Sequence, residues 1–423
     1  MARRRLGPVR RARRPFEGLL GPAIGDASQS LGALAFSATT SLVTGFTLAA
    51  VTDTLALFPG LLLLIPAAIG LRGNVFGPLG SRLSTAIHTG TFSWSWRTDS
   101  VLGQNVIGAM ASSLVAAVGL AVIADLVAHL PGRSSALDSA GGEPLDLFDF
   151  VVVSVFGGTV ASVVVLGITL GLAVASVRFG WDLDNVTAPL VSASGDFVTL
   201  PSLVLATLLV QRGNLTRAFA IVFALIAIGV VVLIVRSALT TTRRILLESV
   251  PVLLAAGTLS LVAGIVLERS IGRFLTFSVL LILLPGYLAA AGALGGILSS
   301  RLSTKVQLGL IQAARIPRGG ARSDIRITFT LALPIFMLLA TLAGTVGATG
   351  ARTSPGLALL ILVAVSGGLV ATAFVAAIAY YGTLLVVRFG LDPDNHGIPM
   401  VSASLDVVGS LTLVGALLLW GVA

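Results

Sequence analysis

The chain has 423 residues, of which 56% are hydrophobic and only 11% are charged. A soluble globular protein carries about 25% charged residues, so the composition excludes a water-soluble domain and indicates a chain whose main solvent is lipid. Cysteine is absent, which excludes disulfide bonds and thiolate metal sites.

The amino-terminal tail, residues 1–28, is basic and precedes the first apolar stretch. Seven arginines lie within its first 14 residues, out of 27 basic residues in the chain and a net charge of +9. A basic run before the first span is typical of a cytoplasmic amino terminus. A secretory signal would need a compact apolar stretch and a cleavage site directly after it, and neither follows here. We therefore interpret the charge as a topology signal and expect no nucleic-acid partner.

Eleven apolar stretches follow along the chain. A transmembrane helix needs about 20 apolar residues, and the 48 glycines suit helices that pack closely within a membrane. The stretches cover residues 31–51, 54–71, 102–130, 147–177, 189–211, 217–235, 249–267, 274–298, 326–349, 356–387 and 399–422. We expect an all-α polytopic membrane protein with about 11 transmembrane helices.

The basic residues of the connecting segments predict the orientation. With the amino terminus inside, the inner segments hold 21 Lys and Arg and the outer segments hold six. The inner set comprises residues 1–14, 72–97, 178, 236–244, 301–326 and 388. This asymmetry follows the positive-inside rule. We expect a multi-pass protein of the cell membrane with its amino terminus in the cytoplasm and its carboxyl terminus outside.

An internal repeat organises these helices. Residues 178–196 and 388–406 share 12 of 19 positions at an offset of 210. The segment Ser-Arg-Leu-Ser-Thr at 81–85 recurs at 300–304, and a proline stands 16 residues before its arginine in both copies. Helices 1–5 and 7–11 are therefore predicted to be two copies of one five-helix unit.

The helix near residues 217–235 belongs to neither copy. Five spans reverse the direction of the chain, so one additional span lets both copies enter the membrane from the same side. The predicted arrangement is 5+1+5, with a pseudo-two-fold axis along the membrane normal. The predicted domains are the basic tail (1–28), the first repeat (29–212), a linker with helix 6 (213–244) and the second repeat (245–423).

Two aspartates are the candidate ion ligands. Asp196 and Asp406 each lie inside an apolar stretch, at the same position of their repeat. A charged carboxylate in the bilayer costs about 2.5–3.5 kcal/mol on insertion scales, so it usually faces a cavity or a partner. A divalent cation between the two would keep both carboxylates ionised. The alternative is a pair that only ties helices together through hydrogen bonds to serines.

Hydroxyl groups extend this candidate site. Ser192 and Ser402 precede the aspartates by four residues and so lie on the same helical face. Thr199 and Ser410 continue the polar stripe. Oxygen-only surroundings favour hard cations such as magnesium, calcium or manganese.

A second acidic motif precedes helices 5 and 11. Its members are Asp182, Asp184 and Asn185, with Asp392, Asp394 and Asn395 in the second copy. Side chains of this kind cap helix amino termini, and the alternative role is to attract cations toward a pore.

The Gly73–Asn74 pair stands at the predicted end of helix 2, after Pro66 and Gly70. The amide oxygen of Asn74 is a candidate ion ligand, and an ordinary helix stop is the alternative. In the segment that follows, we expect Arg82 to anchor the chain to the cytoplasmic membrane surface, as Arg301 does in the second copy.

These motifs resemble the MgtE-type divalent cation transporters, and more closely their duplicated relatives in solute carrier family 41. The resemblance rests on residues 70–74 (Gly-Leu-Arg-Gly-Asn), on 81–85, and on 182–196 with the repeat at 392–406. It implies five-helix units that pair around a central ion pore, here within one chain. It also implies that Asp196 and Asp406 take the place of the family's pore carboxylate, and that Gly73 and Asn74 form its glycine–asparagine motif.

The resemblance implies transport of a divalent cation, above all Mg²⁺, by a protein that is not an enzyme and holds no prosthetic group. The expected state is a monomer with internal pseudo-two-fold symmetry, with a homodimer as the alternative. Two features depart from the family pattern. Ala293 replaces Asn74 in the second copy, and Phe76 and Gly77 replace polar residues that commonly follow the motif.

Three alternatives to a magnesium transporter stay open. The first is a transporter or exchanger of another cation, such as Mn²⁺ or Co²⁺ or a Na⁺-coupled exchange. An intramembrane aspartyl protease also uses two helix-borne aspartates, although a Gly-x-Gly-Asp motif is absent from the sequence. A non-transporting membrane scaffold is the third.

Overall fold

The computed structural model describes residues 24–58, 60–129, 145–179, 183–307, 315–349, 353–388 and 398–422. Two predictions fall largely outside these residues: most of the basic tail, and Asp182, Asp392, Asp394 and Asn395 of the second acidic motif. Asp184 and Asn185 lie in the first turn of a helix.

The described chain is helical, with short connections between the helices. The helices are α3 (Ile24–Ala50), α4 (Thr52–Leu57), α5 (Leu61–His88), α6 (Val101–Ala128), α7 (Leu147–Val152), the π-helix η3 (Val153–Gly157), α8 (Gly158–Phe179), α9 (Leu183–Thr207), α10 (Asn214–Arg236), α11 (Thr240–Arg269), α12 (Ile271–Thr276), α13 (Val279–Gln307), α14 (Gly320–Thr349), α15 (Leu357–Arg388) and α16 (Ile398–Leu419). They follow the predicted apolar stretches in order, with α7, η3 and α8 joined into one long element.

Ten helices in the described part of the chain are long and apolar enough to cross a membrane. The 27-residue helix α3 precedes them. Backbone polar groups have no water to bond in lipid, so helices that satisfy them internally are the structure expected for such apolar segments. The protein is an all-α polytopic membrane protein, as predicted, and the 5+1+5 arrangement stays a prediction.

Helix α5 corrects the prediction that helix 2 ends at Gly73 and Asn74. It runs from Leu61 to His88 without a break, with Pro66 and Pro78 inside it. Neighbouring helices and local adjustments satisfy the backbone groups that a proline frees in a membrane helix. Arg72 and Arg82 therefore lie in a helix and not in the inner connecting segment to which we assigned them.

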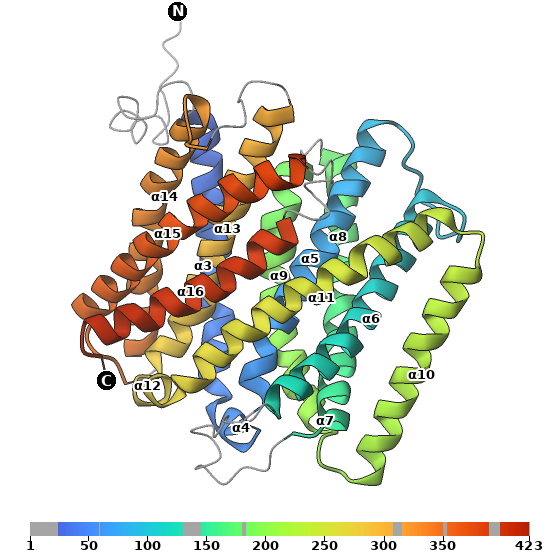
Figure 1. Cartoon of the computed structure of the whole chain (residues 1–423), viewed down its shortest axis with the longest axis horizontal. Coiled ribbons are helices and arrows are strands. Elements are labelled where there is room, and N and C mark those ends of the chain that lie inside the picture. Colours follow the sequence, from blue (N-terminus) through green and yellow to red (C-terminus); the bar gives the residue numbers. More distant parts are fainter. Residues whose placement is uncertain are drawn as a thin grey trace, which may run out of the picture.

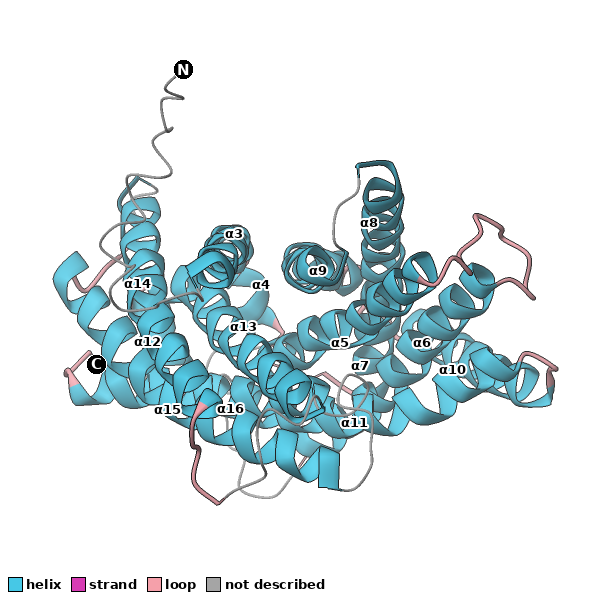
Figure 2. Ribbon diagram, turned by 90° about the horizontal axis from the view of Figure 1, so that it is seen from above, coloured by secondary structure: helices cyan, strands magenta, loops and turns pink. Residues whose placement is uncertain are grey.

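Two central helices organise the bundle. Viewed from above, α5 and α13 both lie between α3 and α9 on one face and α11 and α16 on the other (Figure 2). The remaining long helices of the first repeat stand at one end of this arrangement, and α14 and α15 of the second repeat stand at the other (Figure 1). The middle of the molecule is therefore built from both repeats.

The first helix of each repeat packs against the central helix of the other repeat. α3 contacts α13, and α11 contacts α5. At these crossings Gly45 of α3 meets the backbone of Ile282, and Gly264 of α11 meets the backbone of Leu63. A Cβ added at Gly45 would lie 2.1 Å from the carbonyl oxygen of Ile282, and one added at Gly264 would lie 2.4 Å from that of Leu63. Small residues allow this close approach of membrane helices. The two repeats thus exchange their first helices.

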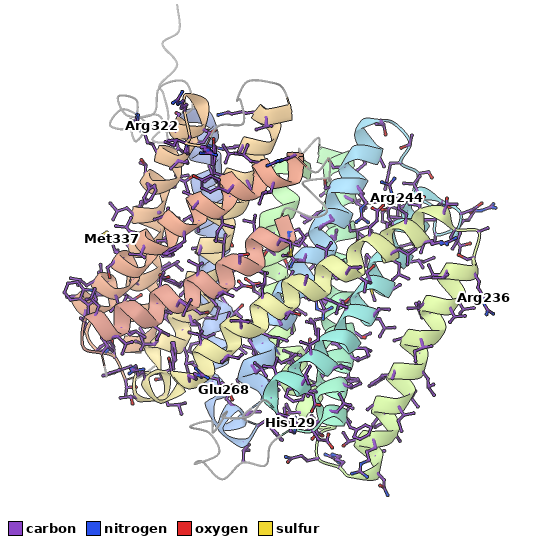
Figure 3. The ribbon with its side chains drawn as sticks, viewed as in Figure 1. His129, Arg236, Arg244, Glu268, Arg322 and Met337 are labelled. Carbon is purple, nitrogen blue, oxygen red and sulfur yellow. The ribbon has the colours of Figure 1, made fainter. Side chains whose placement is uncertain are left out.

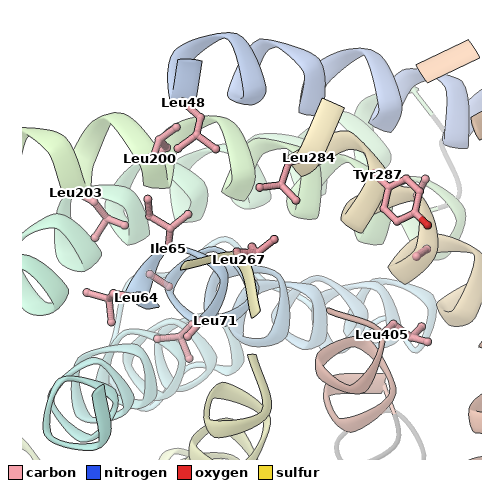
Figure 4. Close-up of a cluster of buried hydrophobic side chains, with 14 of the residues drawn as sticks. Leu48, Leu64, Ile65, Leu71, Leu200, Leu203, Leu267, Leu284, Tyr287 and Leu405 are labelled. Atoms are coloured by element: carbon pink, nitrogen blue, oxygen red, sulfur yellow. The ribbon is translucent and has the colours of Figure 1, made fainter. Parts of the chain in front are cut away.

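Apolar side chains fill the space between the central helices and their neighbours. Figure 4 shows Leu48 of α3, Leu200 of α9, Leu64 of α5, Leu284 of α13 and Leu405 of α16, each at most 3% exposed. Interiors of this kind are packed as densely as organic crystals. The polar groups described below are set into this close-packed interior, so their partners are fixed by the helices.

The two ends of the bundle differ in the residues they carry. Arg322 and Arg244 lie toward the end opposite to Glu268 and His129 (Figure 3). Arg244 and Arg322 belong to segments that the sequence assigns to the same side of the membrane, and these two residues lie toward one end of the bundle. Helix α10 runs along the edge of the bundle, where it contacts α6 and α7, and only 17% of its apolar window is buried.

Candidate ion-binding site

Asp196 of α9 is held inside the bundle by a neighbouring helix. Its side chain is buried, with the residue 7% exposed. The hydroxyl group of Ser41 in α3 donates a hydrogen bond of 3.3 Å to its Oδ2 atom. A buried carboxylate needs such donors because it has left water behind.

Asp406 of α16 has the corresponding surroundings in the second repeat. Ser260 of α11 donates a hydrogen bond of 2.7 Å to its Oδ2 atom. The two serines also correspond in sequence, since Ser-Leu-Val begins at both Ser41 and Ser260. Each carboxylate on a fifth helix is therefore bonded by a hydroxyl group on a first helix.

The two carboxylates approach the central helices from opposite faces. A Cβ added at Gly70 of α5 would lie 3.6 Å from Oδ2 of Asp406, so this carboxylate of the second repeat reaches the central helix of the first. Helix α9, which carries Asp196, also packs against α5. Like charges at short range repel, and a cation between them relieves the repulsion.

The serines predicted beside the aspartates face glycines of the central helices. The Oγ atom of Ser192 would lie 3.4 Å from a Cβ at Gly73, and that of Ser402 would lie 3.8 Å from a Cβ at Gly292. Ser192 is exposed and Ser402 is partly exposed. The hydroxyl groups that bond the carboxylates are instead those of the first helices.

Asn74 turns toward other neighbours. It lines a small pocket of about 10 Å³, with Arg82 of α5, Ser112 of α6 and Ser249 of α11 among the lining residues. A space of this size holds about one water molecule. The structure thus places Asp406 beside Gly70 and Asn74 in a separate polar pocket one turn beyond Gly70.

Among the described residues, five hydroxyl groups are buried without a hydrogen-bond partner, and three of them lie near Ser41 or the two aspartates in the sequence. These three belong to Thr44, Thr199 and Ser410. Thr44 and Thr199 lie about one turn beyond Ser41 and Asp196, and Ser410 lies about one turn beyond Asp406. Buried polar groups almost always bond to protein, water or an ion. These oxygens extend the polar region on both sides of the molecule.

Comparison with known families accounts for this duplicated architecture. The family model MgtE, described as a divalent cation transporter, matches residues 65–206 and 284–416. Together the two segments exceed half of the chain. The chain belongs to the MgtE family. The matches cover α5 to α9 and α13 to α16, so each MgtE segment contains one central helix and one of the two aspartates.

The relatives of this MgtE protein are members of solute carrier family 41. Member 2 from Xenopus laevis is 24% identical over 371 residues, which make up 83% of this chain and 64% of that protein. Member 3 from Mus musculus is 24% identical over 375 residues, or 84% of this chain and 74% of that protein. The chain therefore spans less than two thirds of the length of the Xenopus relative.

A solved structure with a weak likeness belongs to another group of transporters. The crystal structure of the eukaryotic MATE transporter AtDTX14 is 13% identical, with 93% of this chain and 96% of that chain covered, and its TM-score is 0.32. A TM-score this low does not indicate a common fold.

The donor set of this MgtE protein is made of oxygen atoms. Within the described residues, no group of three or more His, Cys, Asp or Glu side chains gathers to hold a metal ion. Two carboxylates, with hydroxyl groups around them, suit a hard cation that keeps part of its water shell, as Mg²⁺ does.

Sequence reasoning missed Ser41 and Ser260. Their signal was present, because Ser-Leu-Val-Thr-Gly at 41–45 recurs as Ser-Leu-Val-Ala-Gly at 260–264, at the same offset of 219 as the Ser-Arg-Leu-Ser-Thr repeat. The serine of this motif bonds the carboxylate, and its glycine meets the opposite central helix. One short motif therefore serves both the site and the exchange of helices.

Proposed function

We propose that this protein transports Mg²⁺ across the cell membrane, along a path beside the two central helices in which Asp196 and Asp406 are the ion ligands. One observation carries the proposal: two equivalent carboxylates lie within apolar helices long enough to span a membrane, both helices contact α5, and each carboxylate is bonded by an equivalent serine. Membership of a divalent cation transporter family supports it.

The charge balance favours a divalent ion at this position. Two ionised carboxylates supply two negative charges, which repel each other in a low-dielectric interior unless a cation or a proton compensates them. A single Mg²⁺ supplies the matching charge, and its preference for several retained water molecules suits ligands that bond it loosely. The buried hydroxyl groups of Thr199 and Ser410 are suited to bond those water molecules.

Uptake of Mg²⁺ into proteoliposomes tests the proposal. We expect the wild type to take up Mg²⁺, Asp196→Asn and Asp406→Asn each to reduce the rate by at least about ten-fold, and the double variant to abolish it, because an amide supplies no negative charge. Asp99→Asn serves as the control, since Asp99 is an exposed carboxylate in the α5–α6 connection.

The outcomes separate the alternatives. Undiminished uptake by a folded double variant contradicts the paired-carboxylate site. Uptake of Mn²⁺ or Co²⁺ in place of Mg²⁺ would assign another cation to the same path. Absence of transport by the wild type under any ion gradient would favour a membrane scaffold.

A further inference from the structure

A buried arginine distinguishes the two repeats. Arg72 of α5 is 1% exposed, although the sequence placed it in a connecting segment. Its Nη1 atom donates hydrogen bonds to the hydroxyl groups of Ser113 in α6 and, at 2.6 Å, of Ser162 in α8. Its Nε atom has no hydrogen-bond partner among the described residues. A charged side chain inside a membrane-spanning segment is costly and usually serves a function.

The hydrogen-bond partners of Arg72 do not neutralise it. Within the part of the chain that the structure describes, the ion pairs involve other residues, and the contacts of the Arg72 guanidinium group are two neutral hydroxyls. An arginine side chain keeps its charge in proteins. The first repeat therefore contains a fixed positive charge without a bonded carboxylate.

The second repeat fills the same space with an apolar ring. At the offset of 219 that relates the central helices, Ala291 replaces Arg72. Gly158 of the first repeat faces the Arg72 guanidinium group, and a Cβ added at Gly158 would lie 2.7 Å from Nη2 of Arg72. The corresponding Gly368 of the second repeat faces the ring of Phe336, and a Cβ added there would lie 2.3 Å from that ring. The two repeats thus differ by one positive charge at an otherwise equivalent position.

Arg72 lies on the Asp196 side of α5. A Cβ added at Gly195, the neighbour of Asp196, would lie 3.0 Å from the Cβ of Arg72. Gly70, which faces Asp406, is two residues away and so points about 200° around the helix from Arg72. The guanidinium group itself lies between α5, α6 and α8, where it meets Ser113, Ser162 and Gly158, and the body of α5 separates it from Asp406.

We propose that Arg72 makes the two carboxylates unequal, so that the transported cation binds more tightly on the Asp406 side than on the Asp196 side. The inference rests on the proposed function. The fixed charge repels a cation beside Asp196, and its effect is large because charges interact strongly in a low-dielectric interior. With Arg72, the two carboxylates and one Mg²⁺ leave a net positive charge, which favours release of the ion. Conduction requires binding that is weak enough for the ion to leave.

Variants of the full chain that change this charge test the proposal. The half-saturating Mg²⁺ concentration is measured by uptake into proteoliposomes and, independently, by calorimetric titration of the purified protein with Mg²⁺. We expect Arg72→Met to lower it by at least about ten-fold. Arg72→Lys, which keeps a positive charge, retains most of the wild-type value. Arg97→Met is the control, because the Arg97 side chain is 79% exposed.

A transplant keeps the packing while it removes the charge. Phe336 corresponds to Ala117, whose Cβ also faces Gly158, so Arg72→Ala with Ala117→Phe builds the second-repeat arrangement into the first. We expect the same shift as for Arg72→Met. The reciprocal variant, Ala291→Arg with Phe336→Ala, adds a charge to the second repeat and is expected to raise the half-saturating concentration by at least about ten-fold.

The inequality itself is tested with the aspartates. Asp406→Asn is expected to raise the half-saturating concentration more than Asp196→Asn does, and the difference is expected to shrink in the Arg72→Met background. The proposal is overturned if a folded variant that lacks the Arg72 charge keeps the half-saturating Mg²⁺ concentration of the wild type. If those variants fail to fold, an unchanged half-saturating concentration in the reciprocal variant overturns it. Equal effects of the two aspartates in both backgrounds also overturn it. A wild type that neither binds nor transports Mg²⁺ instead defeats the proposed function.

Discussion

Each of the two intramembrane carboxylates is bonded by one serine, and the two hydrogen bonds differ in length. Ser260 bonds Asp406 at 2.7 Å, whereas Ser41 bonds Asp196 at 3.3 Å. Hydrogen bonds to ionised groups are stronger than those between neutral groups and are usually short. The geometry therefore assigns the firmer support to Asp406, the carboxylate that lies away from Arg72.

We expect Ser260→Ala to impair the protein more than Ser41→Ala. Loss of a hydrogen bond to a charged group costs about 1.5–3 kcal/mol, and the shorter bond should account for the larger share. The rate of Mg²⁺ uptake and the melting temperature in detergent measure the two effects. Thr258→Ala is the matched control on α11, because its hydroxyl group is exposed and bonds only the backbone of its own helix. A larger effect of Ser41→Ala contradicts this ranking.

The sequence predicted part of this site. Asp196 and Asp406 were identifiable because a carboxylate inside an apolar stretch is rare and each lies in the same duplicated context. Arg72 was misassigned because an arginine beside a Gly-Asn pair has the composition of a connecting segment. Only the packing of α5 against α6 and α8 shows that its charge is buried.

At the scale of helices, two glycines allow the first helix of each repeat to pack closely against the central helix of the other. Gly45 and Gly264 sit where a first helix crosses the opposite central helix, and neither crossing has room for a side chain. The sequence indicated helices and small residues but not this exchange. Hydrophobic periodicity specifies which residues are buried, and it does not specify which of two similar helices buries them.

We expect Gly45→Ala and Gly264→Ala to destabilise the protein by about 1–3 kcal/mol each, because an overpacked contact forces the backbones apart. Thermal unfolding in detergent measures the loss. Gly171→Ala in α8 and Gly229→Ala in α10 are the controls, since nothing lies within 4 Å of a Cβ at either position. Unchanged melting temperatures for the first pair would contradict the close crossings.

Neither repeat is self-contained at the scale of the whole molecule. The helix that supplies Ser41 to the first repeat packs on α13 of the second, and the helix that supplies Ser260 to the second packs on α5 of the first. The site and the interface between repeats therefore share the same two helices. The internal repeat and the all-helical class were visible in the sequence, whereas this interdependence required the structure.

Separation of the chain in the turn between α10 and α11 tests this interdependence. We expect fragments 1–236 and 237–423, when co-expressed, to co-purify and to take up Mg²⁺, because each supplies the partner of the other's first helix. Either fragment alone should fail to form a stable monomer. Light scattering after size-exclusion chromatography measures this, and a stable, monomeric first fragment would contradict the exchange.

The exchange of first helices also imposes an order on biosynthesis. A ribosome completes α3 long before it reaches α13, since every helix of the first repeat and the linker lie between them. During that interval Gly45 has no backbone to meet, and the newly inserted helix faces lipid on the side that its partner will later cover. Contacts that join distant parts of a chain form slowly. Completion of the first aspartate's surroundings therefore waits for translation of the second repeat, so a prematurely terminated chain leaves its first helix without the partner that covers it.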